Sequence, residues 1–186
     1  MKLAITGTPG VGKSTISKYL KDRLMKKGIS VRHVDLTKVV KKNKLYIEKD
    51  EYMDSYVVDF QRLREYLKDL KGDFVILDGH ISHLLDVDYI VVLRCNPQVI
   101  MERLKRRGYP EEKIKENVGA EILDVSLVES LERLKNENIP VYEIDTTSRS
   151  IDFILNEIIH AVENKKINYG VVDWLEDYFF MIRELE

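Results

Sequence analysis

Residues 7–14 read GTPGVGKS, which matches the pattern G-x-x-x-x-G-K-[S/T] of phosphate-binding loops. The apolar run 2–6 precedes this stretch, and a run with helical spacing of apolar residues follows it from residue 15 to residue 27. Strand, glycine-rich loop and helix in that order form the context in which the pattern binds phosphate. The stretch therefore predicts an anion-binding loop at the end of the first strand.

The residue types of this loop suit that chemistry. Glycine adopts backbone angles that a β-carbon forbids, so successive N–H groups can turn inward around an anion. The helix that follows directs its partial positive end at the same place. Lys13 would reach the outer phosphates of a nucleoside triphosphate, and the Ser14 hydroxyl would bind Mg²⁺. The alternative is a glycine turn in front of a structural helix.

Length and composition favour one globular domain. The chain has 186 residues, of which 44% are hydrophobic and 33% charged, and this size can bury a core. The net charge of −2 provides no general attraction to nucleic acid or to an anionic membrane. A single cysteine, Cys95, excludes an internal disulfide and favours a reducing compartment. We find neither a membrane-spanning run nor a signal peptide, so we expect a cytoplasmic protein without membrane or sequence-specific nucleic-acid binding.

Five apolar runs, each leading into a helical pattern, predict a five-stranded parallel sheet with helices on both faces. They are residues 2–6, 29–34, 74–77, 89–93 and 141–144. Residues 45–58 show neither helical nor strand periodicity, and we expect an irregular, functional loop there. Residues 111–121 are expected to be a charged segment leading into a helix that carries Leu127 and Leu131.

Polar residues at the carboxyl ends of these strands are candidates for the site. Asp35 follows the second run, where it can cap the next helix, bind a ligand, or do both. Lys38 belongs to a lysine-rich stretch that is either a solvated face or a second anion site. Asp78 follows four apolar residues, the pattern of an acid that holds a magnesium shell. His80 is either an ordinary histidine or a group beside the γ-phosphate.

Two further groups allow two interpretations each. Arg103 and Arg107 are favoured by the dipole at a helix C-terminus, but we prefer the interpretation that they stabilise a transferring phosphoryl group. The C-terminal helical tail, residues 170–186, is capped by Asp173. Its apolar stripe either packs on the protein's own core or makes this a docking helix for a partner, and we favour the core. The predicted stripe consists of Trp174, Leu175, Tyr178, Phe179, Ile182 and Leu185.

Three stretches together resemble one family. GTPGVGKST at residues 7–15, LDGH at 77–80, and RLKRRGY at 103–109 with EKIKENVGAEI at 112–122 resemble the small P-loop nucleoside monophosphate kinases. Within these, the chain is similar to adenylate kinase isoenzyme six, which is also described as a ribosome-maturation ATPase. The resemblance covers residues 2–162. It implies a P-loop nucleoside triphosphate hydrolase fold of nucleoside monophosphate kinase type, as one domain over residues 1–186.

The resemblance also implies the parts of the site. It implies an acceptor-binding segment at about 35–58, with Asp35 and Lys38, and a short lid at about 106–118. It implies that Asp78 and His80 lie around Mg²⁺ and the γ-phosphate. Family members usually carry an arginine where this chain has Lys38, and lysine lacks the two-pronged contact with phosphate. We expect ATP to be bound by Gly10, Val11, Gly12, Lys13, Ser14, Thr15 and Arg107.

These residues lead to two hypotheses. The first is phosphoryl transfer from Mg·ATP to AMP, with Lys13, Asp78, His80, Arg103 and Arg107 as catalytic residues, Ser14 and Asp78 as metal ligands, and ATP hydrolysis as an accompanying activity. The second is an ATP-hydrolysing assembly factor for the small ribosomal subunit that acts through a small-subunit ribosomal protein. A kinase for another small metabolite on the same fold is a third possibility.

Overall fold

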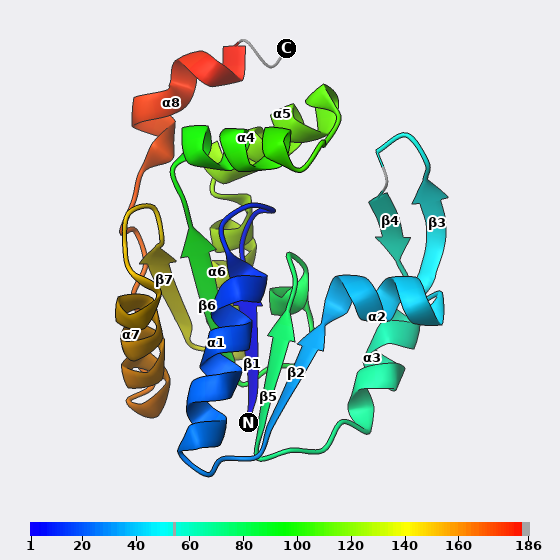
Figure 1. The fold of residues 1–186 in the computed structure, drawn as a ribbon, viewed down its shortest axis with the longest axis vertical. Helices are drawn as coiled ribbons and strands as arrows, with labels where there is room; N and C mark the ends of the chain where they lie inside the picture. The colour runs from blue at the N-terminus through cyan, green and yellow to red at the C-terminus, as the bar shows by residue number, and fades with distance from the viewer. Residues whose placement is uncertain (54, 184–186) are drawn as a thin grey trace.

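The computed structural model describes residues 1–53 and 55–183. Its centre is a five-stranded sheet in which all paired strands are parallel, in the order β2-β5-β1-β6-β7 (Figure 1). The strands are β1 (Lys2–Thr6), β2 (Val31–Asp35), β5 (Phe74–Asp78), β6 (Tyr89–Arg94) and β7 (Val141–Asp145). The predicted five-stranded parallel α/β fold is confirmed.

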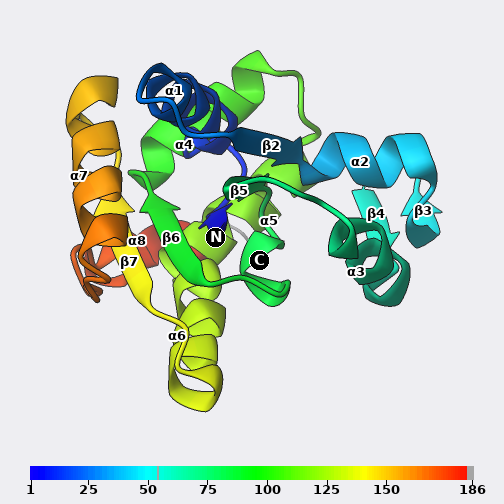
Figure 2. The same ribbon diagram turned by 90° about the horizontal axis from the view of Figure 1, so that it is seen from below.

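Helices cover both faces of this sheet, as the view from below shows (Figure 2). One face packs against α1 (Lys13–Lys26) and α7 (Ile151–Glu163), and their apolar side chains join those of the strands in one buried cluster. The other face packs against α2 (Leu36–Asn43), α3 (Phe60–Lys68) and α6 (Val125–Glu137). The central strands are buried on both faces because helices lie on each side of them.

Three helices lie beyond the carboxyl ends of the strands, at the top of Figure 1. They are α4 (Pro97–Arg106), α5 (Glu111–Ile122) and α8 (Trp174–Arg183). A 3₁₀ turn, η1 (Ser82–Leu84), follows β5. None of the helices in the described part of the chain has the length and apolarity to cross a lipid bilayer.

The segment that we expected to be irregular is an antiparallel hairpin. Its strands are β3 (Tyr46–Asp50) and β4 (Ser55–Val58), so the sequence prediction for residues 45–58 was wrong. The strand pairing shifts register between Tyr46 and Glu48, and such a bulge interrupts the alternation of apolar and polar residues that marks a strand. Asp54 lies outside the described residues.

The charged segment 111–121 is itself the helix α5, which corrects a second expectation. Ile114, Val118 and Ile122 recur at four-residue spacing on its buried side. Glu121 shares this buried side, with 2% of its surface exposed. The acid on the inner face, together with the many charges on the outer one, hid the helical pattern in the sequence.

The C-terminal helix begins at the predicted cap, because the Asp173 carboxylate accepts hydrogen bonds from the backbone N–H groups of Leu175 and Glu176. Its inward side is rotated from the predicted stripe. Leu175 and Phe179 are 40% and 51% exposed, so their predicted burial was wrong. The inward side chains are Trp174, Tyr178, Met181 and Ile182. Leu185 lies outside the described residues.

Candidate functional site

The glycine-rich loop joins β1 to α1 at the carboxyl edge of the sheet. Gly7 has a φ angle of 128°, and a β-carbon there would stand 2.3 Å from the carbonyl oxygen of Leu93. Gly12, at the start of α1, has a φ angle of 105° in the left-handed region. A β-carbon at Gly12 would meet no atom within 4 Å, so this position borders open space. Backbone conformation at both positions and close packing at Gly7 require glycine.

Several backbone N–H groups of the loop have no acceptor within the part of the protein that the structure describes. Among the described residues, the N–H groups of Gly10, Gly12, Lys13 and Ser14 have no hydrogen-bond acceptor. The N–H group of Val11 instead donates to the carbonyl oxygen of Thr8 over 3.3 Å. Four neighbouring N–H groups at a helix N-terminus form an anion site, because each needs an acceptor and the helix dipole adds positive potential.

Lys13 lies over the same loop. Its Nζ donates to the carbonyl oxygens of Gly7 and Thr8, at 2.7 and 3.0 Å. Burial lowers the pKa of Lys13 from 10.5 to about 8, although the negative charges of Asp78 and Glu121 act in the opposite direction. The site therefore holds a partly buried cation whose charge an incoming anion would stabilise.

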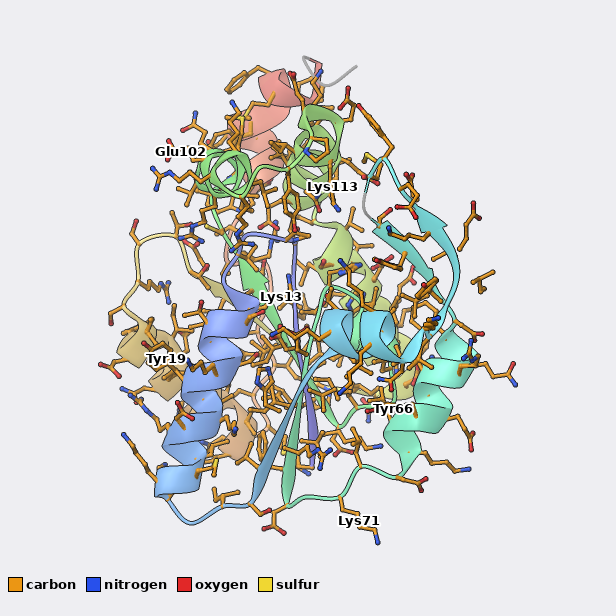
Figure 3. All side chains as sticks on the ribbon, turned by 45° about the vertical axis from the view of Figure 1, so that its right-hand side comes forward. Lys13, Tyr19, Tyr66, Lys71, Glu102 and Lys113 are labelled. Carbon is orange, nitrogen blue, oxygen red and sulfur yellow. The ribbon has the colours of Figure 1, made fainter. Side chains whose placement is uncertain are left out.

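A cleft of about 760 Å³ opens above the loop. Its walls come from the loop, the carboxyl ends of β2 and β5, helix α2, the β3–β4 hairpin and helix α5. Figure 3 shows Lys13 at the start of α1, below the helix that carries Lys113. The predicted site residues that line the cleft are Gly10, Gly12, Lys13, Ser14, Thr15, Asp35, Lys38, Asp78, His80 and Arg107.

Two predicted residues do not line this cleft. Val11 is 1% exposed, and its side chain packs in the core beneath the loop. Arg103 lies behind the loop, where its Nη1 donates to the carbonyl oxygen of Gly10 over 2.8 Å. Arg103 therefore contacts the backbone of the phosphate loop from outside the cleft, whereas Arg107 reaches the cleft itself.

Asp78 is the buried acid at the end of β5, with 2% of its surface exposed. In the parallel pairing of β2 and β5 it stands opposite Asp35. One oxygen, Oδ2, lies 3.2 Å from Nε2 of His33, and this is its single hydrogen-bonded side-chain partner in the described part of the chain. The other oxygen has no protein partner there, although Asp78 lines the cleft.

Asp35 caps a helix and also lines the cleft. Its Oδ1 accepts a hydrogen bond from the backbone N–H of Lys38 at 3.0 Å, which caps α2. Its Oδ2 lies 2.9 Å from Nζ of Lys38. Burial alone would raise the pKa of Asp35, but the hydrogen bonds and charge of Lys38 lower it. The helix cap is confirmed, and both side chains face the cleft.

His80 lines the floor of the cleft and remains exposed to solvent there. The surrounding walls, followed by the positive charges of Lys13, His83 and Lys113, lower its pKa to about 4. An exposed ring is only partly desolvated in the open cleft, but the direction of the shift leaves His80 neutral at pH 7. A neutral imidazole can orient a water molecule or a phosphate oxygen, but it does not neutralise phosphate charge.

The structure adds residues that the sequence reasoning missed. Lys113 and Asn117, one turn apart on α5, line the cleft, as does Tyr56 on the hairpin. The sequence did not mark these three residues as candidates, because α5 and the hairpin were not recognised as a helix and a pair of strands. His33 was missed as well, although it lies one residue before the end of the predicted strand 29–34, a position from which a side chain can reach the sheet's carboxyl edge.

The hairpin and α5 also touch each other across the mouth of the cleft. The Tyr52 hydroxyl donates to Oε2 of Glu112 over 2.9 Å, and Nζ of Lys113 donates to the carbonyl oxygen of Met53. Two segments that are distant in sequence thus meet above the phosphate loop and close one side of the cleft.

Known proteins provide an independent comparison. A family model described as an AAA domain matches residues 3–124. A protein of Methanocaldococcus jannaschii described as a "putative adenylate kinase" is 57% identical over 181 residues, which cover 96% of this chain and 96% of its own length. A protein of Methanococcus maripaludis with the same description is 51% identical over 182 residues, covering 98% and 99%. This chain belongs to that adenylate kinase family.

A solved structure agrees with the fold of this adenylate kinase family member. The deoxyadenosine kinase from M. mycoides superposes with a TM-score of 0.56 and 20% sequence identity, covering 89% of this chain and 100% of that one. At this identity the likeness concerns the fold alone. Residues 3–124, which the family model matches, include the phosphate loop, Asp35, Asp78 and α5, and thus most of the cleft.

Proposed function

We propose that this protein transfers the γ-phosphoryl group of Mg·ATP to AMP, forming two molecules of ADP. One observation carries the proposal: the unsatisfied N–H groups of the loop and the partly buried cation of Lys13 meet at one end of a cleft that continues to Asp35 and the hairpin. A volume of about 760 Å³ falls in the range of ligand pockets and suits two small ligands placed end to end. The description of the relatives as adenylate kinases supports nucleotides as these ligands.

Each part of the cleft then has a role. The loop and Thr15 hold the phosphates of ATP, residues 35–58 bind the acceptor, and residues 106–118 form a lid over both. Lys38 stands beside Asp35 at the acceptor end, where its ammonium group would attract the AMP phosphate as a point charge. The contact between Tyr52 and Glu112 supports this division, because it joins the acceptor segment to the lid.

The transfer itself needs little proton chemistry. An oxygen of the AMP phosphate, already an anion, forms a bond to the γ-phosphorus as the bond to the β–γ bridging oxygen breaks. Lys13 and Arg107 face the cleft and would neutralise charge on the moving group. Arg103 would act through the carbonyl oxygen of Gly10, by holding the loop in shape. His80 would hold a phosphate oxygen or, when no acceptor is bound, the water that hydrolyses ATP.

The residues at the loop also suit Mg²⁺. The Ser14 hydroxyl and the Asp78 carboxylate both line the cleft, and one carboxylate oxygen has no protein partner among the described residues. Two protein oxygens, completed by water and phosphate oxygens, are the donors that Mg²⁺ prefers. Bound there, Mg²⁺ would neutralise charge on the β- and γ-phosphates.

One assay tests the proposal. The protein is incubated with Mg·ATP alone and with AMP, GMP, CMP or UMP, and diphosphate and free phosphate are scored separately. We expect ADP formation from ATP and AMP to exceed phosphate release from ATP alone. Equal turnover with and without AMP would reject the transfer reaction. Lys13→Ala should abolish both activities, and turnover that survives it would place the chemistry elsewhere.

The assembly-factor hypothesis remains as a second candidate. The observation that favours it is the outward side of α8, where Leu175, Phe179 and Phe180 are 40%, 51% and 55% exposed. Such a side suits contact with another macromolecule, and the small-subunit ribosomal protein named by the resemblance would be that partner. Phosphate release that does not depend on AMP, and that rises when the partner is added, would favour this candidate.

A further inference from the structure

We infer that His33 is a positioning residue for magnesium, acting by holding the Asp78 carboxylate in the orientation that the ion requires. The inference rests on the proposed function, because it assumes that Mg·ATP binds at the phosphate loop. His33 belongs neither to the phosphate loop nor to the pair of acids, Asp35 and Asp78, at the strand ends. His33 does not line the cleft, so it acts through Asp78.

The sheet brings the two side chains together. His33 pairs with Ile76 and Asp35 pairs with Asp78 in the parallel register of β2 and β5. Because alternate residues of a strand point to the same face, His33 and Asp78 lie on one face of the sheet, two positions apart along it. The imidazole spans this diagonal, and its Nε2 lies 3.2 Å from Oδ2 of Asp78.

The contact has a defined direction. An ionised carboxylate has no hydrogen to donate, so the hydrogen of this bond belongs to Nε2 of His33. His33 is 19% exposed and Asp78 is 2% exposed, so the bond lies in a largely dry region where a hydrogen bond to a charged group is strong. With Oδ2 held in this way, Oδ1 is left for the shell of the ion.

The surroundings of Asp78 make this restraint necessary. Lys13 and Lys38 interact electrostatically with the same carboxylate, one on the phosphate loop and the other on α2. A carboxylate between two cations can rotate toward either one. Among the described residues, His33 is the side chain that hydrogen-bonds it, so His33 decides which oxygen faces the cleft. Partners that orient a metal-binding carboxylate typically change metal affinity about 10- to 100-fold.

The test measures binding rather than turnover. The dissociation constant of a non-hydrolysable ATP analogue is determined with Mg²⁺ and with EDTA. The constant in EDTA divided by the constant in Mg²⁺ reports how strongly the ion increases nucleotide affinity. For His33→Leu we expect this ratio to fall about tenfold, while the affinity in EDTA stays unchanged because the loop is intact. His33→Gln should retain most of the ratio, since its amide carries an N–H group near the position of Nε2.

Two further variants complete the design. His160→Leu removes an exposed histidine of α7, far along the chain from the cleft, and should leave the ratio unchanged. His33→Leu combined with Asp78→Asn should lower the ratio no further than Asp78→Asn alone, because both changes disable the same ligand. A wild-type ratio in His33→Leu, or an equal loss of affinity in EDTA, would overturn the inference. These readouts require no AMP turnover, so they separate this inference from the transfer reaction.

Discussion

Lys13 carries a strongly lowered pKa beside the phosphate loop. Its ammonium group is partly buried and donates to two carbonyl oxygens of its own loop, and burial lowers its pKa to about 8. A cation in this state is poorly compensated until an anion arrives. Phosphate binding and protonation of Lys13 are therefore linked, and each favours the other.

This linkage predicts proton uptake on nucleotide binding. With a pKa of about 8, Lys13 is about one-tenth neutral at pH 7 and about half neutral at pH 8. Bound triphosphate raises the pKa of Lys13, so the complex takes up the missing fraction of a proton, and uptake grows as the pH rises from 7 to 8. Calorimetric titration with a non-hydrolysable ATP analogue, in buffers of different ionisation enthalpy, measures it. Proton uptake that is the same at pH 7 and pH 8 would contradict the attribution of this uptake to Lys13.

The two arginines near the loop should respond differently to replacement. Arg107→Ala should lower kcat by about a thousandfold, the effect typical of an arginine that stabilises a transferring phosphoryl group, without lowering thermal stability. Arg103→Ala leaves the carbonyl oxygen of Gly10 without its donor and should cost about 1–3 kcal/mol of the free energy of unfolding. Steady-state kinetics and urea unfolding are measured for both variants. A loss of stability without a loss of kcat in Arg107→Ala, together with the reverse in Arg103→Ala, would refute these roles.

At the scale of elements, aspartate caps determine where several helices begin. Asp35 caps α2, Asp59 caps α3 and Asp173 caps α8, each by accepting a hydrogen bond from a backbone N–H in the first turn. Caps of this kind are readable from the sequence because aspartate followed by an amphipathic run is a local signal.

The Asp59 cap yields a prediction that separates stability from catalysis. Its Oδ1 accepts from the backbone N–H of Arg62 at 3.0 Å, and Asp59 is not part of the cleft lining. Asp59→Ala should therefore lower the free energy of unfolding by about 1 kcal/mol. Asp59→Asn, which keeps an acceptor oxygen, is the matched control and should lose much less. Urea unfolding measures both, and kcat for ADP formation should stay at the wild-type value in each.

At the scale of the whole molecule, one buried ion cluster ties distant segments together. Arg94, at the end of β6, donates to Glu121 of α5 over 2.9 Å and to Glu143 of β7 over 2.8 Å. The Glu143 carboxylate also accepts from the backbone N–H of Val171, just before α8, at 2.9 Å. All three side chains are at most 2% exposed. The cluster therefore anchors α5, which lines the cleft, to the sheet and to the C-terminal segment.

Breaking this cluster should be costly in a specific way. Arg94→Met leaves two buried carboxylates unpaired and should lower the free energy of unfolding by about 3–5 kcal/mol. Replacing all three charges, as Arg94→Met with Glu121→Leu and Glu143→Leu, should restore part of that loss. The two buried carboxylates are then removed, and only Asp124, whose side chain is 30% exposed, is left without Arg94. Chemical unfolding of the single and triple variants measures the difference. If the triple variant is less stable than Arg94→Met, the three side chains stabilise the fold by more than the desolvation of their charges destabilises it.

The sequence by itself determined the features that depend on neighbouring residues. The loop of residues 7–14 needs only local backbone geometry, and apolar runs buried on both sides of a sheet are visible without knowing their partners. The parallel sheet, the loop and the capping role of Asp35 were therefore predictable. The hairpin was not, because a bulge shifts the phase of β3, and α5 was not, because its inner face carries Glu121, whose partner Arg94 lies 27 positions away.

Tertiary structure alone decided which side chains share the cleft. The sequence could not show that Arg103 contacts the loop from behind while Arg107 faces the cleft, since both belong to one basic cluster. Nor could it show that His33 reaches Asp78, because strand order and register set that contact across 45 positions of the chain. Local propensity depends on a few neighbours, whereas the site depends on how strand ends and helices are placed relative to one another.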